Sequence, residues 1–240
     1  MKKKIAVPAW ALSALCLIGP LAASGAGDDK KEVPKVKIPQ PGVPQIMTLE
    51  GRYVRAAYNN EGYAILGYRL ANMTVGEKWM LIEIGVTVRG GVHDYTLKRD
   101  ALSLETPDGK TIPLASMEDY RKGDTRSLEL REEHAQRDSI NYFPPEAHQA
   151  CRIGFFAQLD QRAMSWDQVE LSSQRACLGR IFFQIPDGIT YGQHWLNVKF
   201  EKSLVRVPFR ILTKDEDKML DKNYGDIEKQ VKEAFKPKKS

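Results

Sequence analysis

Trp79-Met-Leu-Ile-Glu-Ile-Gly-Val-Thr-Val88 is the stretch of sequence that decides the fold. Every second residue is apolar, which places five side chains on one face of an extended chain: Met80, Ile82, Ile84, Val86 and Val88. A period of two sustained over a whole segment is typical of a β-strand with one buried face. The sequence therefore predicts a long core strand here.

Shorter stretches on both sides repeat the alternation, and turn residues separate them. They lie at 52–58, 63–70, 102–106, 110–114, 181–185, 196–200 and 205–211. Pro107-Asp108-Gly109 predicts a hairpin turn, and Pro208 predicts an edge or a bulge in the last strand. Such strands bury one face each, so residues 46–212 are expected to form an antiparallel β-sandwich, with a β-barrel as the alternative.

Two further stretches carry a family resemblance together with the core strand. They are Tyr95-Thr-Leu-Lys-Arg-Asp-Ala-Leu-Ser-Leu-Glu-Thr-Pro-Asp-Gly-Lys110 and Gly179-Arg-Ile-Phe-Phe-Gln-Ile-Pro-Asp-Gly188. The region from about Tyr68 to Phe200 resembles telokin-like, immunoglobulin-type β-sandwich domains of bacterial exported proteins and lipoproteins of unknown function. The resemblance implies an immunoglobulin-like fold and a place in the cell envelope. It implies no catalytic or cofactor-binding residue.

Two segments depart from the strand pattern. An insert at about 115–150 is charged, begins with a helix-cap signal at Ser116 and is expected to be partly helical. Residues 213–240 predict a C-terminal amphipathic helix, which starts with a Thr213/Glu216 capping box. Its apolar stripe is formed by Leu220, Tyr224, Ile227, Val231 and Phe235. This stripe either docks on the protein's own sheet or is a candidate partner-binding surface.

The first 45 residues predict an export signal followed by a linker. Residues 1–26 combine Lys2, Lys3 and Lys4 with an apolar run and small residues, as a cleaved signal peptide does, and 27–45 are rich in proline. We expect the mature chain to be periplasmic or secreted and to have no transmembrane segment. Losing three lysines brings the formal net charge of +5 close to neutrality, so we expect no nucleic-acid partner.

Two cysteines remain beyond the signal, Cys151 and Cys177. An even pair in an oxidising compartment favours a disulfide, and a metal site that includes His148 is the alternative.

These patterns favour an exported, non-enzymatic protein that binds another envelope protein, associates with itself or has a structural role. We expect no cofactor and no resident metal, since the sequence contains no phosphate loop, no nucleophile elbow and no paired-histidine motif. One alternative is a module that binds carbohydrate or another small ligand through the outward aromatic residues Tyr63, Trp79 and Trp195. The other is a hydrolase with its nucleophile and base near the insert.

Overall fold

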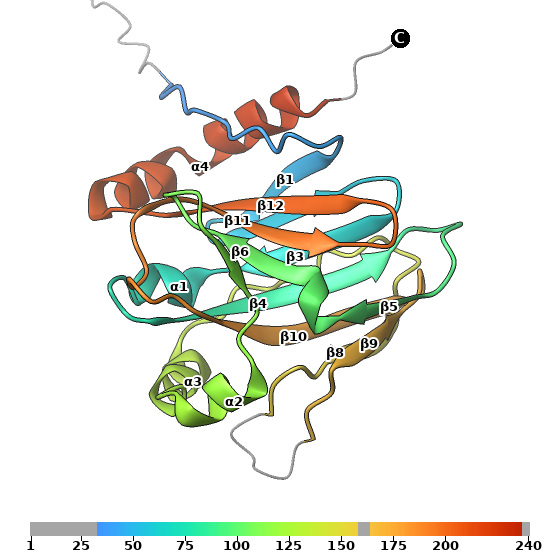
Figure 1. Cartoon of the computed structure of the whole chain (residues 1–240). Coiled ribbons are helices and arrows are strands. Elements are labelled where there is room, and N and C mark those ends of the chain that lie inside the picture. Colours follow the sequence, from blue (N-terminus) through green and yellow to red (C-terminus); the bar gives the residue numbers. More distant parts are fainter. Residues whose placement is uncertain (1–32, 158–163, 237–240) are drawn as a thin grey trace, which may run out of the picture. The chain divides into compact units, whose positions relative to one another are not determined.

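The stretch 79–88 forms strand β4 near the middle of the larger sheet in the computed structural model of the chain (Figure 1). The structure describes residues 33–157 and 164–236. The expected signal peptide, the first part of the linker and the last four residues of the tail lie outside the described residues.

Strands dominate the described part of the chain, and four α-helices accompany them. The strands are β1 (Ile46–Gly51), β2 (Val54–Tyr58), β3 (Gly62–Gly67), β4 (Trp79–Val88), β5 (Tyr95–Lys98), β6 (Leu102–Glu105), β7 (Thr111–Pro113), β8 (Gln149–Ile153), β9 (Gln168–Leu171), β10 (Arg175–Gln184), β11 (Gly192–Lys199) and β12 (Leu204–Ile211). The helices are α1 (Arg69–Met73), α2 (Met117–Lys122), α3 (Arg126–His134) and α4 (Lys214–Ala234), and a 3₁₀ turn covers Arg99–Ala101.

These strands form separate sheets with open strand orders. The larger sheet has six strands in the order β1-β2-β3-β4-β10-β8, a second has four in the order β12-β11-β6-β7, and β5 pairs with β9. The prediction of a mainly β fold with antiparallel sheets and a C-terminal helix is confirmed. Because neither larger sheet closes on itself, the described strands form layers and not a barrel.

One pairing corrects the expectation of purely antiparallel sheets. β8 lies parallel to β10, with Cys151 opposite Cys177. The chain reaches β8 only after the insert and then passes through β9 before entering β10, so β8 and β10 run in the same direction. Parallel neighbours need a long connection of this kind, whereas a tight hairpin turn can join only antiparallel strands.

The two larger sheets pack face to face, and one hydrophobic core contains side chains of both. A Cβ atom added to Gly62 of β3 would lie 2.0 Å from the ring of Phe200, which follows β11. The rings of Tyr68 and Phe209 are 5.3 Å apart between centroids. The sheets therefore meet most closely where the sequence supplies glycine or aromatic side chains.

The edge strand β12 contains Pro208, as its alternating sequence predicted. Residues 33–45, which we call the strap, run beside α4 (Figure 1) and reach the free edge of β12 at Arg206. The Gln45 side chain accepts a hydrogen bond from the Arg206 backbone N–H at 2.8 Å and donates one to the Arg206 carbonyl at 2.6 Å. An amide side chain thus imitates a neighbouring strand. The linker interpretation did not anticipate these contacts.

Helix α4 begins with the predicted capping box, in which Thr213 and Glu216 bond reciprocally. It packs beside β1 and is interrupted at Asn223, whose backbone is not helical. No helix in the described ranges combines the length and the apolar character that crossing a membrane requires.

Candidate functional site

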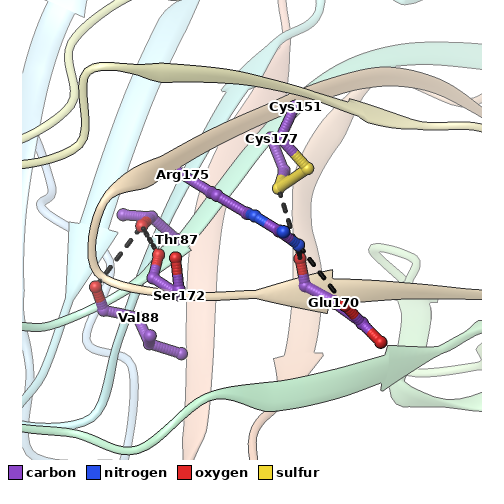
Figure 2. The surroundings of a disulfide bond; sticks show 7 residues. All are labelled: Thr87, Val88, Cys151, Glu170, Ser172, Arg175 and Cys177. Atoms are coloured by element: carbon purple, nitrogen blue, oxygen red, sulfur yellow. Dashed lines mark hydrogen bonds and ion pairs between the residues drawn. A yellow bond between two sulfur atoms is a disulfide. The ribbon is translucent and has the colours of Figure 1, made fainter.

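The cysteine pair forms a disulfide between neighbouring strands. Cys151 on β8 and Cys177 on β10 are joined, and Cys177 is fully buried. Figure 2 shows Glu170 of β9 beside the bond; its carbonyl accepts a hydrogen bond from Arg175 at 3.2 Å. Both sulfurs are used, which removes them as metal ligands and favours the disulfide interpretation over the metal site with His148. A disulfide suits an oxidising compartment.

The apolar stripe of α4 faces the protein's own core. Leu220 and Ile227 are only 6% and 5% exposed. The Tyr224 hydroxyl donates to the Leu49 carbonyl of β1 at 3.2 Å, and Phe235 packs against the same core. In this arrangement the stripe packs within the chain, and its role as a partner-binding surface stays a prediction.

Two of the three aromatic side chains expected to bind sugars are covered, whereas Tyr63 is half-buried and stacks on Tyr58 with 4.7 Å between the ring centroids. Trp79 lies under the insert, where a Cβ atom on Gly123 would be 2.4 Å from its ring, and it is 9% exposed. Trp195 is 8% exposed and stacks under the guanidinium group of Arg206, 4.5 Å from the ring centroid. Neither ring presents the open face on which a sugar would stack.

The insert encloses a group of carboxyl side chains on the outer face of the six-stranded sheet. Glu83 of β4 lies there with Glu129 and Glu132 of α3, and burial raises the pKa of all three. Glu132 is 3% exposed and pairs with Arg180 at 2.7 Å and with Arg137 at 2.8 Å. The pair with Arg180 attaches α3 to β10.

The Tyr120 hydroxyl of α2 extends this network. It contacts both the Glu129 carboxyl group and the Ala157 carbonyl oxygen, the latter at 2.7 Å. A hydroxyl has one proton to donate, so both contacts are satisfied when Glu129 is protonated and donates to the tyrosine oxygen. Burial raises the pKa of Glu129, whereas its hydrogen bond with Tyr120 acts in the opposite direction. The network accounts for the attachment of the insert without any ligand.

A groove of about 1,050 Å³ lies between β7 and the end of β10, and it is our candidate site. At one end it is closed by a hydrogen bond from the Ala115 N–H to the Phe182 carbonyl, at 3.0 Å. At the other end the Lys110 ammonium group pairs with Asp187 at 2.8 Å. The groove is therefore bounded by a backbone bond at one end and by an ion pair at the other.

Both walls of the groove present unused backbone groups. The Thr106 N–H donates to the Lys110 carbonyl, so these two residues form a hydrogen-bonded pair between antiparallel strands. Hydrogen-bonded and non-hydrogen-bonded pairs alternate along such strands, so the N–H and C=O of the next residue, Thr111, point away from β6. On the other wall Ile185 N–H bonds to the Lys78 carbonyl, so the alternation turns the N–H and C=O of Gln184 away from β4. Each wall is a strand edge that an additional strand can pair with.

The side chains give the groove an apolar floor and an acidic rim. The apolar residues are Ile112, Pro113, Leu114, Ile185 and Pro186. Asp108, Asp119 and Asp187 stand against a single cation, Lys110. Hydrogen bonds from Thr106 and Lys110 lower the pKa of Asp108 to about 2, and the two aspartates raise the pKa of Lys110. Asp108 and Lys110 are therefore charged at neutral pH.

The sequence patterns placed the walls of this groove correctly but did not join them. Lys110–Leu114 and Ile181–Ile185 were recognised as strands, yet nothing in their spacing indicated that they face each other. The sequence feature that could have indicated open strand edges is the pair Pro113 and Pro186. Each lacks the N–H that would continue a ladder of hydrogen bonds between strands.

Within the described ranges, no three His, Cys, Asp or Glu side chains come together in an arrangement that could hold a metal ion. Comparison of the chain with protein-family models, with curated proteins and with solved structures found no match in any of the three.

Proposed function

We propose that this protein is an exported, non-enzymatic binding protein of the cell envelope, and that it holds an extended segment of another protein in the groove beside β7. The observation that carries the proposal is the pair of unused strand edges, at Thr111 and Gln184, on opposite walls of one groove. Strand addition obtains affinity from main-chain hydrogen bonds and specificity from alternate side chains.

The lining favours a particular partner chemistry. Alternate side chains of an added strand point to opposite faces, one set toward the apolar floor and the other toward the rim. Three carboxylates and one ammonium group leave the rim net negative. The partner segment is therefore one in which aliphatic residues alternate with Lys or Arg.

The location and the fold family belong to the same proposal. The predicted signal and the disulfide support a place in an oxidising compartment. The resemblance of Trp79–Val88 and its neighbours to immunoglobulin-type exported domains supports an immunoglobulin-like β-sandwich.

The test uses a synthetic peptide of alternating Val and Lys residues, titrated calorimetrically into the purified protein. Thr111→Pro removes the outward N–H and is expected to weaken binding about tenfold. Asp187→Asn removes a rim charge and is expected to weaken binding about threefold, with a smaller effect at high salt. Thermal melting of each variant checks that it is folded.

Asp100→Asn is the matched control, since Asp100 is an exposed acid that lies outside the groove. The proposal requires this variant to bind as the unmodified protein does. Binding that is unaffected by Thr111→Pro, or reduced equally by Asp100→Asn and Asp187→Asn, would refute the groove as the site.

A further inference from the structure

A second cavity, independent of the groove, lies under α4 and the strap and has a volume of about 600 Å³. Its walls come from the strap and β1, which follow each other in the sequence, and from β12 and α4 near the other end of the chain. The volume falls in the range of about 300–1,000 Å³ that small-molecule sites occupy.

The cavity walls combine buried aliphatic and aromatic side chains with the polar side chains of Thr48, Gln193 and Glu216 and with two arginines. Met47 and Leu49 of β1 are 3% and 5% exposed, and Phe209 of β12 is 1% exposed. Leu220 and Ile227 of α4 line the opposite side. Empty space of this size among apolar side chains sacrifices dispersion contacts, which a bound aliphatic chain would restore.

The strap forms the roof in an alternating pattern. Val36 and Ile38 are partly buried and line the cavity, whereas Lys35 and Lys37 are exposed and flank it. Neither lysine has an ion-pair partner within the described residues. By contrast, Arg210 at the same cavity is paired with Glu216 at 2.6 Å.

The other arginine at the cavity is also occupied. Arg55 donates to the carbonyls of Gly51 and Val54, both at 2.8 Å, and to the Tyr68 hydroxyl at 2.6 Å. Among the described residues, the cations at the cavity whose donors remain free for a ligand are therefore the two strap lysines. A largely apolar cavity with these two cations at its rim fits an amphiphile with an anionic head.

The strap is attached on both sides of the cavity but not above it. Gln230 of α4 accepts from the Val36 N–H at 3.2 Å and donates to the Pro34 carbonyl at 2.8 Å. The next attachment is the Pro41 carbonyl, which accepts from Arg206 at 2.7 Å. In the described part of the chain, no hydrogen bond ties residues 37–40 to α4 or to the sheets. This span can lift without breaking a hydrogen bond to its surroundings.

We propose that this cavity binds a free single-chain fatty acid, with the aliphatic tail under α4 and the carboxylate between Lys35 and Lys37. The tail contacts the aliphatic and aromatic side chains of the cavity, and the head remains at the rim, where it is partly hydrated. Partial hydration keeps the contribution of each lysine small.

The experiment titrates palmitate, below the concentration at which it forms micelles, into the purified protein, with hexadecanol as the uncharged probe. We expect one saturable site. Ile38→Trp places a larger side chain of the strap in the cavity and is expected to abolish the binding of both probes. Lys35→Gln together with Lys37→Gln should weaken palmitate about fivefold and leave hexadecanol unchanged.

The control is Lys98→Gln together with Lys199→Gln. This double variant also removes two lysine charges, but from exposed positions that do not line this cavity. Equal loss of palmitate affinity in this control would show a general effect of net charge and would overturn the proposal. The absence of a saturable site, or binding that survives Ile38→Trp, would also overturn it. The proposal would also be overturned if the protein associated with vesicles of anionic phospholipid but did not bind free palmitate, since that result would identify a membrane surface as the ligand.

Discussion

Acidification tests how completely the core excludes water around His194. This side chain is fully buried, and its ring stacks on that of Phe209 at a centroid distance of 5.3 Å. Its Nδ1 atom lies 3.1 Å from the Gly192 carbonyl, and we assign the ring proton to that nitrogen; Nε2 has no hydrogen-bond partner. Burial lowers the pKa of His194 from 6.5 to about 4.

The folded protein therefore resists protonation at a site that the unfolded chain protonates readily. The stabilisation from a neutral His194 is complete above the unfolded pKa of 6.5 and is lost as the pH falls through 6.5 toward about 4. The displacement of the pKa corresponds to a loss of about 3 kcal/mol in the free energy of unfolding between about pH 7.5 and about pH 4.

The assay is urea unfolding at a series of pH values, for the unmodified protein and for His194→Asn and His194→Phe. Both variants lack the titrating ring, so their stability is expected to fall by about 3 kcal/mol less over this range. The comparison is needed because the raised pKa values of Glu83, Glu129 and Glu132 change stability in the opposite sense. Identical pH profiles for the variants and the unmodified protein would refute the assignment of a buried, neutral His194.

Three further predictions concern stability. Reducing the disulfide, which spans 26 residues, should lower the free energy of unfolding by about 3.5 kcal/mol in denaturant titrations. Gln45→Ala should cost about 1–2 kcal/mol and speed amide hydrogen exchange at Arg206, and an unchanged exchange rate there would contradict the covered edge. Gly62→Ala should destabilise by about 1–3 kcal/mol through collision with Phe200, whereas Gly90→Ala, whose added Cβ would meet only Glu146 Oε1 at 3.9 Å, should be nearly neutral in thermal melts.

The strands were predictable because their signal is local. Alternation alone located Trp79–Val88 and the last strand, where Pro208 also indicated the edge position. The same signal misled at residues 63–70, where the strand ends at Gly67 and helix α1 begins at Arg69. The Tyr68 side chain is buried against Phe209, so tertiary packing decides where that strand stops.

Both candidate sites depend on contacts that no local pattern contains. The groove needs Thr111 and Gln184 on opposite walls, and the chain brings them together only through the packing of two sheets. The prolines of residues 27–45 predict a linker. The strap nevertheless contains an alternation of charged and apolar residues, which indicates a segment with one apolar face: Lys35, Val36, Lys37 and Ile38. Proline density reports the absence of regular structure and says nothing about docking.

Amide hydrogen exchange at two residues, measured by NMR with and without the alternating Val/Lys peptide, tests the central proposal most directly. In the free protein the amides of Thr111 and Gln184 should exchange rapidly, since neither has a partner in the described structure. The peptide should protect both, while the exchange of Asp100 stays unchanged. Slow exchange of both amides before any peptide is added, or protection that appears elsewhere in the chain, would contradict strand addition in this groove.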